Sequence, residues 1–177
     1  SLSLLVIALA SPFLGAMGDY LGAKKRFLAA FLTVGTVATA ALALVGPGDW
    51  LLAAGLYLLG NIGFSGSIIF SDSLLPHIAR PDEIDRVSSG GWALGYLGGG
   101  LLLAFNVALL TAPQFFGLAD AAAASRVSFL TVAVWWAVFS LPLLLRVPEP
   151  PRRLLAGESG AASATAAAAR RLRGTFG

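Results

Sequence analysis

A carboxylate and three consecutive cations in one short connection of this chain could form ion pairs. The carboxylate is Asp19, and the cations are Lys24, Lys25 and Arg26. Cations at such a place can also be a plain basic flank that extends to lipid headgroups. That alternative leaves Asp19 unexplained, because the C-terminal end of a helix disfavours an anion. The pattern therefore favours a charge cluster that joins two helix ends.

Hydrogen-bonding side chains inside apolar runs offer a second kind of chemistry. Asn61 lies inside the run 50–71, and Ser65 follows one turn later on the same helix face. Asn61 is roughly 16 Å along a helix from the start of this run, near the middle of a ~30 Å hydrocarbon layer. An amide at that depth needs a partner. A neighbouring helix could supply it, and so could a ligand. Asn106 is a weaker example in the run 89–111.

The residue inventory argues against an enzyme. The chain has no cysteine and one histidine, His77, so thiolate and histidine-built metal sites and a Ser-His-Asp triad are not expected. The apolar runs hold no converging acid, base or metal ligands. We therefore expect no catalytic residue, no metal and no cofactor.

The composition predicts a membrane protein. Hydrophobic residues make up 57% of the 177 residues, charged residues make up 12%, and the mean hydropathy is +0.82. Soluble domains carry about a quarter charged residues. So few charges cannot cover a soluble core of this size, and we expect a lipid bilayer around the chain.

Five apolar runs have about the length that a membrane helix needs, ~20 residues. They cover residues 1–18, 27–46, 50–71, 89–111 and 127–145. Glycine and proline mark the breaks, with Pro76 and Pro81 placed in the third connection. The expected fold is an all-α transmembrane bundle over residues 1–147, followed by a linker or tail over 148–177.

The distribution of cations predicts the orientation. Eleven of the twelve Lys and Arg residues lie in the connections 19–26 and 72–88 and in the tail, and Arg126 lies on the opposite side. This asymmetry places the first group in the cytoplasm. It also explains the net charge of +3 without nucleic-acid binding. The abundance of Arg, Ala and Gly suggests a prokaryotic inner membrane, with the tail in the cytoplasm.

The beginning of the chain suggests a fragment. Residue 1 lies within a hydrophobic run, without an initiator methionine or a basic leader. We therefore expect at least one helix upstream of this segment.

The first connection resembles the loop between helices two and three of the major facilitator superfamily, G-x-x-x-D-x-x-G-x-[RK]-[RK]. The matching residues are Gly15, Asp19, Gly22, Lys24 and Lys25. Gly15 would allow close backbone approach on the Asp19 face, and Gly22 would allow a positive-φ turn. The family often has a cation directly after the aspartate, where this chain has Tyr20, so Lys24 or Arg26 is expected to replace it.

Residues 71–102 resemble the vacuole-effluxer-like branch of that superfamily. The matching residues are Leu75, Pro76, Ser88, Ser89, Gly91, Trp92, Ala93, Leu94, Gly95, Tyr96, Gly98 and Gly99. Asp72 stands where this branch is expected to have asparagine. The two resemblances align the five runs with helices two to six, so the first helix and the C-terminal half of the family fold are expected to be missing partners.

The resemblance implies a transporter that moves a small polar solute by alternating access, with amino acid efflux as a candidate. It makes Asn61, Ser65 and Asn106 substrate-binding candidates. It also implies that Gly15, Asp19, Gly22, Lys24, Lys25 and Arg26 form a conformational latch that favours the state closed to the cytoplasm. The alternative is a membrane scaffold of the same fold that transports nothing.

Small residues predict where helices approach closely. Gly91, Gly95 and Gly99 recur every four residues, so they share one stripe that should pack against a neighbouring helix. Gly60, Gly63 and Ser67 form a comparable stripe on the preceding run.

Overall fold

The chain folds into long α-helices, as its composition predicts. The computed structural model describes residues 2–151 and contains no strand in this part of the chain. The helices are α1 (Leu2–Leu21), α2 (Lys24–Ala41), η1 (Leu42–Leu44), α3 (Trp50–Ile78), α4 (Ile84–Thr111), η2 (Pro113–Phe116) and α5 (Ala121–Arg146).

Four segments of the described part are long and apolar enough to cross a membrane. They are Lys24–Leu44, Trp50–Ile78, Ile84–Thr111 and Ala121–Arg146. The fifth expected span, 1–18, coincides with α1, although its side chains before Ala10 lie outside the described residues. The protein is therefore an integral membrane protein. The tail beyond residue 151 also lies outside the described residues.

The helices extend further than their apolar runs, most clearly α3, α4 and α5. α4 begins at Ile84 and not at 89, and α5 begins at Ala121 and not at 127. Asp120 caps α5, because its side chain accepts a hydrogen bond from the Ala123 N–H at 2.8 Å. α3 continues through Pro76 to Ile78, so the prediction that Pro76 breaks the helix was wrong. Proline removes only the donor to the carbonyl of residue 72 and leaves the remaining turn intact.

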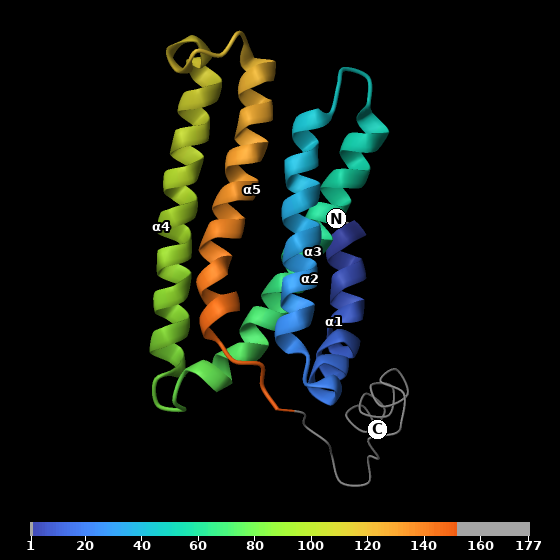
Figure 1. The fold of residues 1–177 in the computed structure, drawn as a ribbon, viewed down its shortest axis with the longest axis vertical. Helices are drawn as coiled ribbons and strands as arrows, with labels where there is room; N and C mark the ends of the chain where they lie inside the picture. The colour runs from blue at the N-terminus through green and yellow to red at the C-terminus, as the bar shows by residue number, and fades with distance from the viewer. Residues whose placement is uncertain (1, 152–177) are drawn as a thin grey trace.

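The helices run alternately up and down (Figure 1). The α1–α2 and α3–α4 connections lie at one end of the molecule, and the α2–α3 and α4–α5 connections lie at the other. α1, α2 and α3 form one group, and α4 and α5 form a pair that joins this group along α2 and α5. The predicted cytoplasmic connections therefore share one end, which we call the basic end.

The closest helix contact is between α2 and α3, where two glycines meet. A Cβ added at Gly63 would collide with the backbone of Gly35 and would lie 2.7 Å from the Phe31 carbonyl oxygen. Phe70 continues this contact towards the basic end, where its ring stacks on Phe27 with centroids 5.2 Å apart. The small residues of α3 thus bring two backbones together, as their spacing predicts.

The glycine stripe of α4 does not pack as predicted. A Cβ added at Gly91, Gly95 or Gly99 would meet nothing within 4 Å in the described part of the chain. Gly91 and Gly95 line an open space between α3, α4 and α5, whereas a Cβ added at Gly98 would lie 3.6 Å from the Trp135 ring of α5. Small residues permit close approach, but the position of the neighbouring helix decides whether it occurs.

Candidate functional site

The turn between α1 and α2 has the geometry that its glycine allows. Only Gly22 and Ala23 separate the two helices. Gly22 has a φ of 58°, a region that other residues rarely adopt. The Ala23 N–H donates to the Gly18 carbonyl at 3.3 Å and closes the end of α1. The turn therefore brings the last turn of α1 beside the first turn of α2.

Lys24 forms the ion pair with Asp19 that the sequence analysis expects from either Lys24 or Arg26. Its Nζ lies 2.7 Å from Oδ1 of Asp19, with the side chains 12% and 34% exposed. The same Nζ donates to the Ser73 carbonyl of α3 at 3.4 Å. One ammonium group thus joins α1, α2 and α3. Because the pair is partly shielded from water, the attraction is stronger than at an open surface.

Gly18, and not Gly15, is where α1 approaches α3 closely. A Cβ at Gly18 would lie 2.8 Å from the Phe70 ring, whereas one at Gly15 would meet nothing within 4 Å among the described residues. The close approach that Gly15 would allow is thus not made among the described residues and stays a prediction. Tyr20 lies beside this contact and is only 2% exposed.

Lys25 ties the start of α2 to the segment that follows α5. Its Nζ donates to the Val147 carbonyl at 2.8 Å, and its backbone N–H donates to Oε1 of Glu149 at 2.8 Å. Arg26 is exposed and has no hydrogen bond or ion pair within residues 2–151. The contact with Glu149 was not predicted, because no local pattern relates residues so distant in the sequence.

Asn61 lines a cavity of about 430 Å³ between α2, α3 and α5. The other lining residues include Thr39, Tyr57 and Trp136. The Asn61 side-chain amide donates to the Tyr57 carbonyl of its own helix at 2.9 Å. Its Oδ1 accepts no hydrogen bond from residues 2–151, so an acceptor remains available at this depth. Within residues 2–151, Asn61 therefore makes no hydrogen bond to a neighbouring helix, which was the alternative role for this residue.

Ser65 does not line that cavity, although it lies one turn beyond Asn61. The residues that accompany Asn61 are Gly60 and Phe64 from α3 and Phe129, Val132 and Trp136 from α5. Sequence periodicity places Asn61 and Ser65 on one face. The cavity is also lined by residues of α2 and α5, whose positions the periodicity of α3 does not describe.

Asn106 makes a hydrogen bond to a neighbouring helix. This is one of the two roles that we expected for an asparagine at membrane depth, the other being contact with a ligand. Asn106 is 8% exposed, and its Oδ1 accepts a hydrogen bond from the Thr131 hydroxyl at 2.8 Å. This bond joins α4 to α5. Its acceptor is therefore occupied, unlike that of Asn61.

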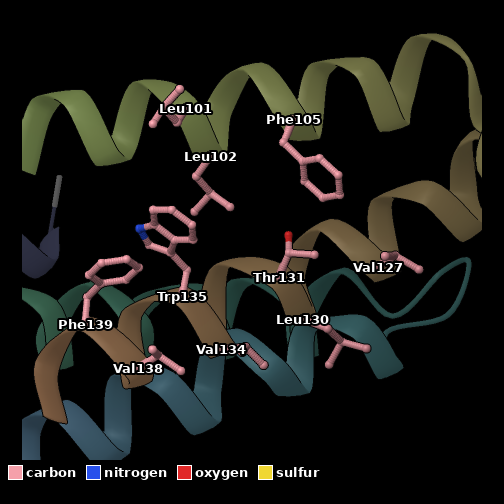
Figure 2. A pocket seen from close by; sticks show the side chains of 10 residues that line it. All are labelled: Leu101, Leu102, Phe105, Val127, Leu130, Thr131, Val134, Trp135, Val138 and Phe139. Atoms are coloured by element: carbon pink, nitrogen blue, oxygen red, sulfur yellow. The ribbon is translucent and has the colours of Figure 1, made fainter.

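An open groove of about 730 Å³ lies between α4 and α5 (Figure 2). Its lining residues are Leu101, Leu102, Phe105, Val127, Leu130, Thr131, Val134, Trp135, Val138 and Phe139. Figure 2 shows the Trp135 indole and Leu102 reaching into the space between the two helices. Thr131 supplies the one hydroxyl group among these lining residues, and this hydroxyl donates a hydrogen bond to Oδ1 of Asn106. Such a lining suits hydrocarbon and not a polar solute.

A metal site has no support in the described part of the chain. Within residues 2–151, no three His, Asp or Glu side chains lie close enough together to hold an ion.

Known proteins resemble this chain over nearly its whole length. A family model described as "Vacuole effluxer Atg22 like" matches residues 1–85 and 81–176. The chain is 33% identical over 150 residues to the "Uncharacterized MFS-type transporter YxiO" of Bacillus subtilis (strain 168), covering 84% of this chain and 35% of that protein. It is 27% identical over 157 residues to "Autophagy-related protein 22" of Saccharomyces cerevisiae (strain YJM789), covering 80% of this chain and 29% of that protein.

The alignment with these curated relatives therefore covers about a third of their length. No solved structure matches the chain significantly.

Proposed function

The chain belongs to the vacuole effluxer Atg22-like family of the major facilitator superfamily, and we propose that it works in a transporter for a small polar solute. Amino acids are the first candidates, and efflux is the proposed direction. The family description and the name of the Bacillus subtilis relative refer to transport and not to catalysis, which supports a protein that is not an enzyme. Because the relatives are about three times as long as the aligned segment, we propose that further helices complete the pathway.

The observation that carries this proposal is the available acceptor of Asn61 in a cavity at membrane depth. A polar side chain inside a bilayer is costly and is retained for a partner. The Asn61 amide can accept a hydrogen bond from a solute while it keeps its bond to Tyr57. Tyr57 of α3 and Thr39 of α2, which both carry hydroxyl groups, also line this cavity. The cavity therefore offers a few polar contacts within an apolar lining, as small-molecule sites do.

The proposed mechanism is alternating access, in which two halves of a transporter rock about a central site. In this proposal Gly15, Asp19, Gly22, Lys24, Lys25 and Arg26 form the latch that favours the state closed to the cytoplasm. The ion pair between Lys24 and Asp19 supports such a role, because it fixes the shape of the basic end. We place that end in the cytoplasm and the protein in a prokaryotic inner membrane.

The test is ligand-dependent thermal unfolding of the full-length protein in detergent, with panels of amino acids, sugars and organic ions. A solute that binds the folded state stabilises it by RT ln(1 + [L]/Kd), so Tm rises with the logarithm of its concentration once this exceeds Kd. We expect a shift that grows with solute concentration as this relation requires and that Asn61→Leu abolishes. Asn106→Leu is the matched control, because it replaces another membrane-depth asparagine whose acceptor is already used. It should lower the basal Tm and preserve the ligand-dependent shift.

The scaffold alternative predicts a different result. No compound would then shift Tm, reconstituted vesicles would show no solute flux, and Asn61→Leu would leave the biological role intact. That combination of results would contradict the proposed function.

A further inference from the structure

An open cavity that includes an exposed carboxylate, Asp72, lies at the basic end, between α3, α4 and α5. It has a volume of about 370 Å³ and is lined by Ser71 and Asp72 of α3, Ser88 and Trp92 of α4, and surrounding apolar residues. We call it the Asp72 cavity. Its volume falls within the range of small-molecule sites, about 300–1,000 Å³. It is separate from the Asn61 cavity, with which it shares no lining residue.

The polar groups of this cavity have no partners in the described part of the chain. No Lys or Arg among residues 2–151 forms a salt bridge with Asp72, although two cations at the same end are paired with Asp19 and Glu83. The hydroxyls of Ser71 and Ser88 also make no hydrogen bond there. Their neighbours Ser73 and Ser89 instead donate to carbonyls of their own helices, at 2.8 and 2.6 Å, as helical serines commonly do.

Pro76 adds a further acceptor at the same point. In a helix, the N–H of residue 76 would bond to the carbonyl of residue 72, and proline has no N–H to donate. Pro76 lies inside α3. The Asp72 carbonyl therefore lacks its usual donor, so this residue offers both a carboxylate and a backbone oxygen.

The remaining walls suit an organic group. Trp92 lines the cavity, and its indole face can attract a cation. Ile68, Leu75 and Leu143 supply apolar surface. Gly91 and Gly95 line the cavity without side chains, and a Cβ at either would meet nothing within 4 Å in the described chain. A bare ion would leave most of this space unfilled.

We propose that the Asp72 cavity binds a small organic cation, a solute with a protonated amine, and that Asp72 is its counter-ion. The ammonium group is held by the Asp72 carboxylate and the Ser71 and Ser88 hydroxyls, and its organic part lies against Trp92 and the apolar wall. This inference rests on the proposed function, because it names the class of solute that the transporter recognises.

The test measures binding of three primary amines to the full-length protein in detergent at neutral pH. The probes are ethylammonium, butylammonium and phenethylammonium chlorides, with 2-phenylethanol as the uncharged counterpart of the third and NaCl as the inorganic cation. We expect saturable binding of at least one amine, weak binding of 2-phenylethanol, and no competition by NaCl at matched ionic strength. Asp72→Asn should weaken amine binding by about tenfold or more, the effect of one charged contact.

Asp82→Asn is the matched control, because Asp82 is an exposed carboxylate of the neighbouring loop at the same end. It should leave amine binding unchanged. Asp72→Glu keeps the charge and should retain most of the affinity, so it separates loss of the counter-ion from loss of the fold.

Several results would overturn the inference. They are equal binding by Asp72→Asn and the original protein, no saturable binding of any of the three amines, or competition by NaCl that identifies an inorganic cation site. If the Tm shift that depends on Asn61 persists in such a case, only the Asp72 inference fails. If no compound shifts Tm and no flux is found, the proposed function fails with it.

Discussion

The Nζ of Lys24 lies 2.7 Å from Oδ1 of Asp19, across the turn that Gly22 makes. The carboxylate sits at the C-terminal end of α1, where the helix dipole opposes it. The nearby ammonium compensates for this placement and also bonds to the Ser73 carbonyl on α3. The charge cluster therefore determines how three helices meet at the basic end.

A double-mutant cycle of Asp19→Asn and Lys24→Gln should show coupling between the two side chains. Because the pair is partly shielded, we expect a coupling free energy of about 1 kcal/mol, at the upper end for exposed pairs. The measurement is apparent stability in detergent for the two single variants and the double variant. Additive effects would contradict the structure.

The matched control for that cycle is the pair of Arg80 and Glu83. Its atoms are equally close, 2.7 Å, but the side chains are 74% and 41% exposed. Solvent screens such a pair. Arg80→Gln should therefore leave the apparent stability unchanged.

Gly22→Ala should destabilise the turn between α1 and α2. A side chain at a φ of 58° costs about 1 kcal/mol because the Cβ crowds the backbone. Gly22→Asn should cost less, since asparagine tolerates this region better. Tm in detergent distinguishes the two substitutions. Gly15→Ala is the control, because its Cβ meets no described atom.

Gly63→Ala should separate α2 from α3. Its Cβ would collide with the backbone of Gly35, which cannot rotate away as a side chain can. Overpacking of this kind costs about 1–3 kcal/mol. Gly55→Ala on the same helix meets nothing within 4 Å and should be neutral or slightly stabilising. Equal Tm values for the two variants would show that the glycine contact is absent.

Thr131→Val should weaken the contact between α4 and α5. It keeps the side-chain shape and removes the donor to Asn106. Bonds between membrane helices contribute about 0.6 kcal/mol on average and up to about 1.7 kcal/mol. Thr33→Val is the control, because the Thr33 hydroxyl bonds only within α2. The decrease in Tm should be clearly larger for Thr131→Val.

Single cysteines can test the orientation, because this sequence contains no cysteine of its own. Asp82 and Gln114 are exposed residues in the connections at opposite ends of the bundle. In intact cells, an impermeant thiol reagent should label Gln114→Cys and should not label Asp82→Cys. The reverse pattern would place the basic end outside the cytoplasm.

The helical fold was predictable because a bilayer leaves few alternatives for the backbone. The helix ends were less predictable. Hydropathy marks the part of a helix that lies in lipid, whereas the cap at Asp120 and the polar first turn of α4 extend the helices beyond it. The prediction that Pro76 breaks the helix was wrong for a related reason, since one missing hydrogen bond does not end a helix.

The charge cluster was predictable because its members are close in sequence. The pairing of Asp19 with Lys24 depends on one short turn and on the glycine that allows it. The partners of Lys25 depend on where α5 ends, which is a property of the tertiary structure. The same reason explains the two asparagines. Sequence places both at membrane depth, and the packing of α5 decides that Asn106 is bonded and Asn61 is available.

The two-residue connection between α1 and α2 has a consequence for biosynthesis. A connection of only Gly22 and Ala23 is too short for one helix to cross the bilayer while the other helix remains outside it. We therefore expect the pair to insert as one hairpin, whose turn, in the orientation that the cations predict, stays on the cytoplasmic side. The cations that begin α2 then act on the direction of both helices in a single event.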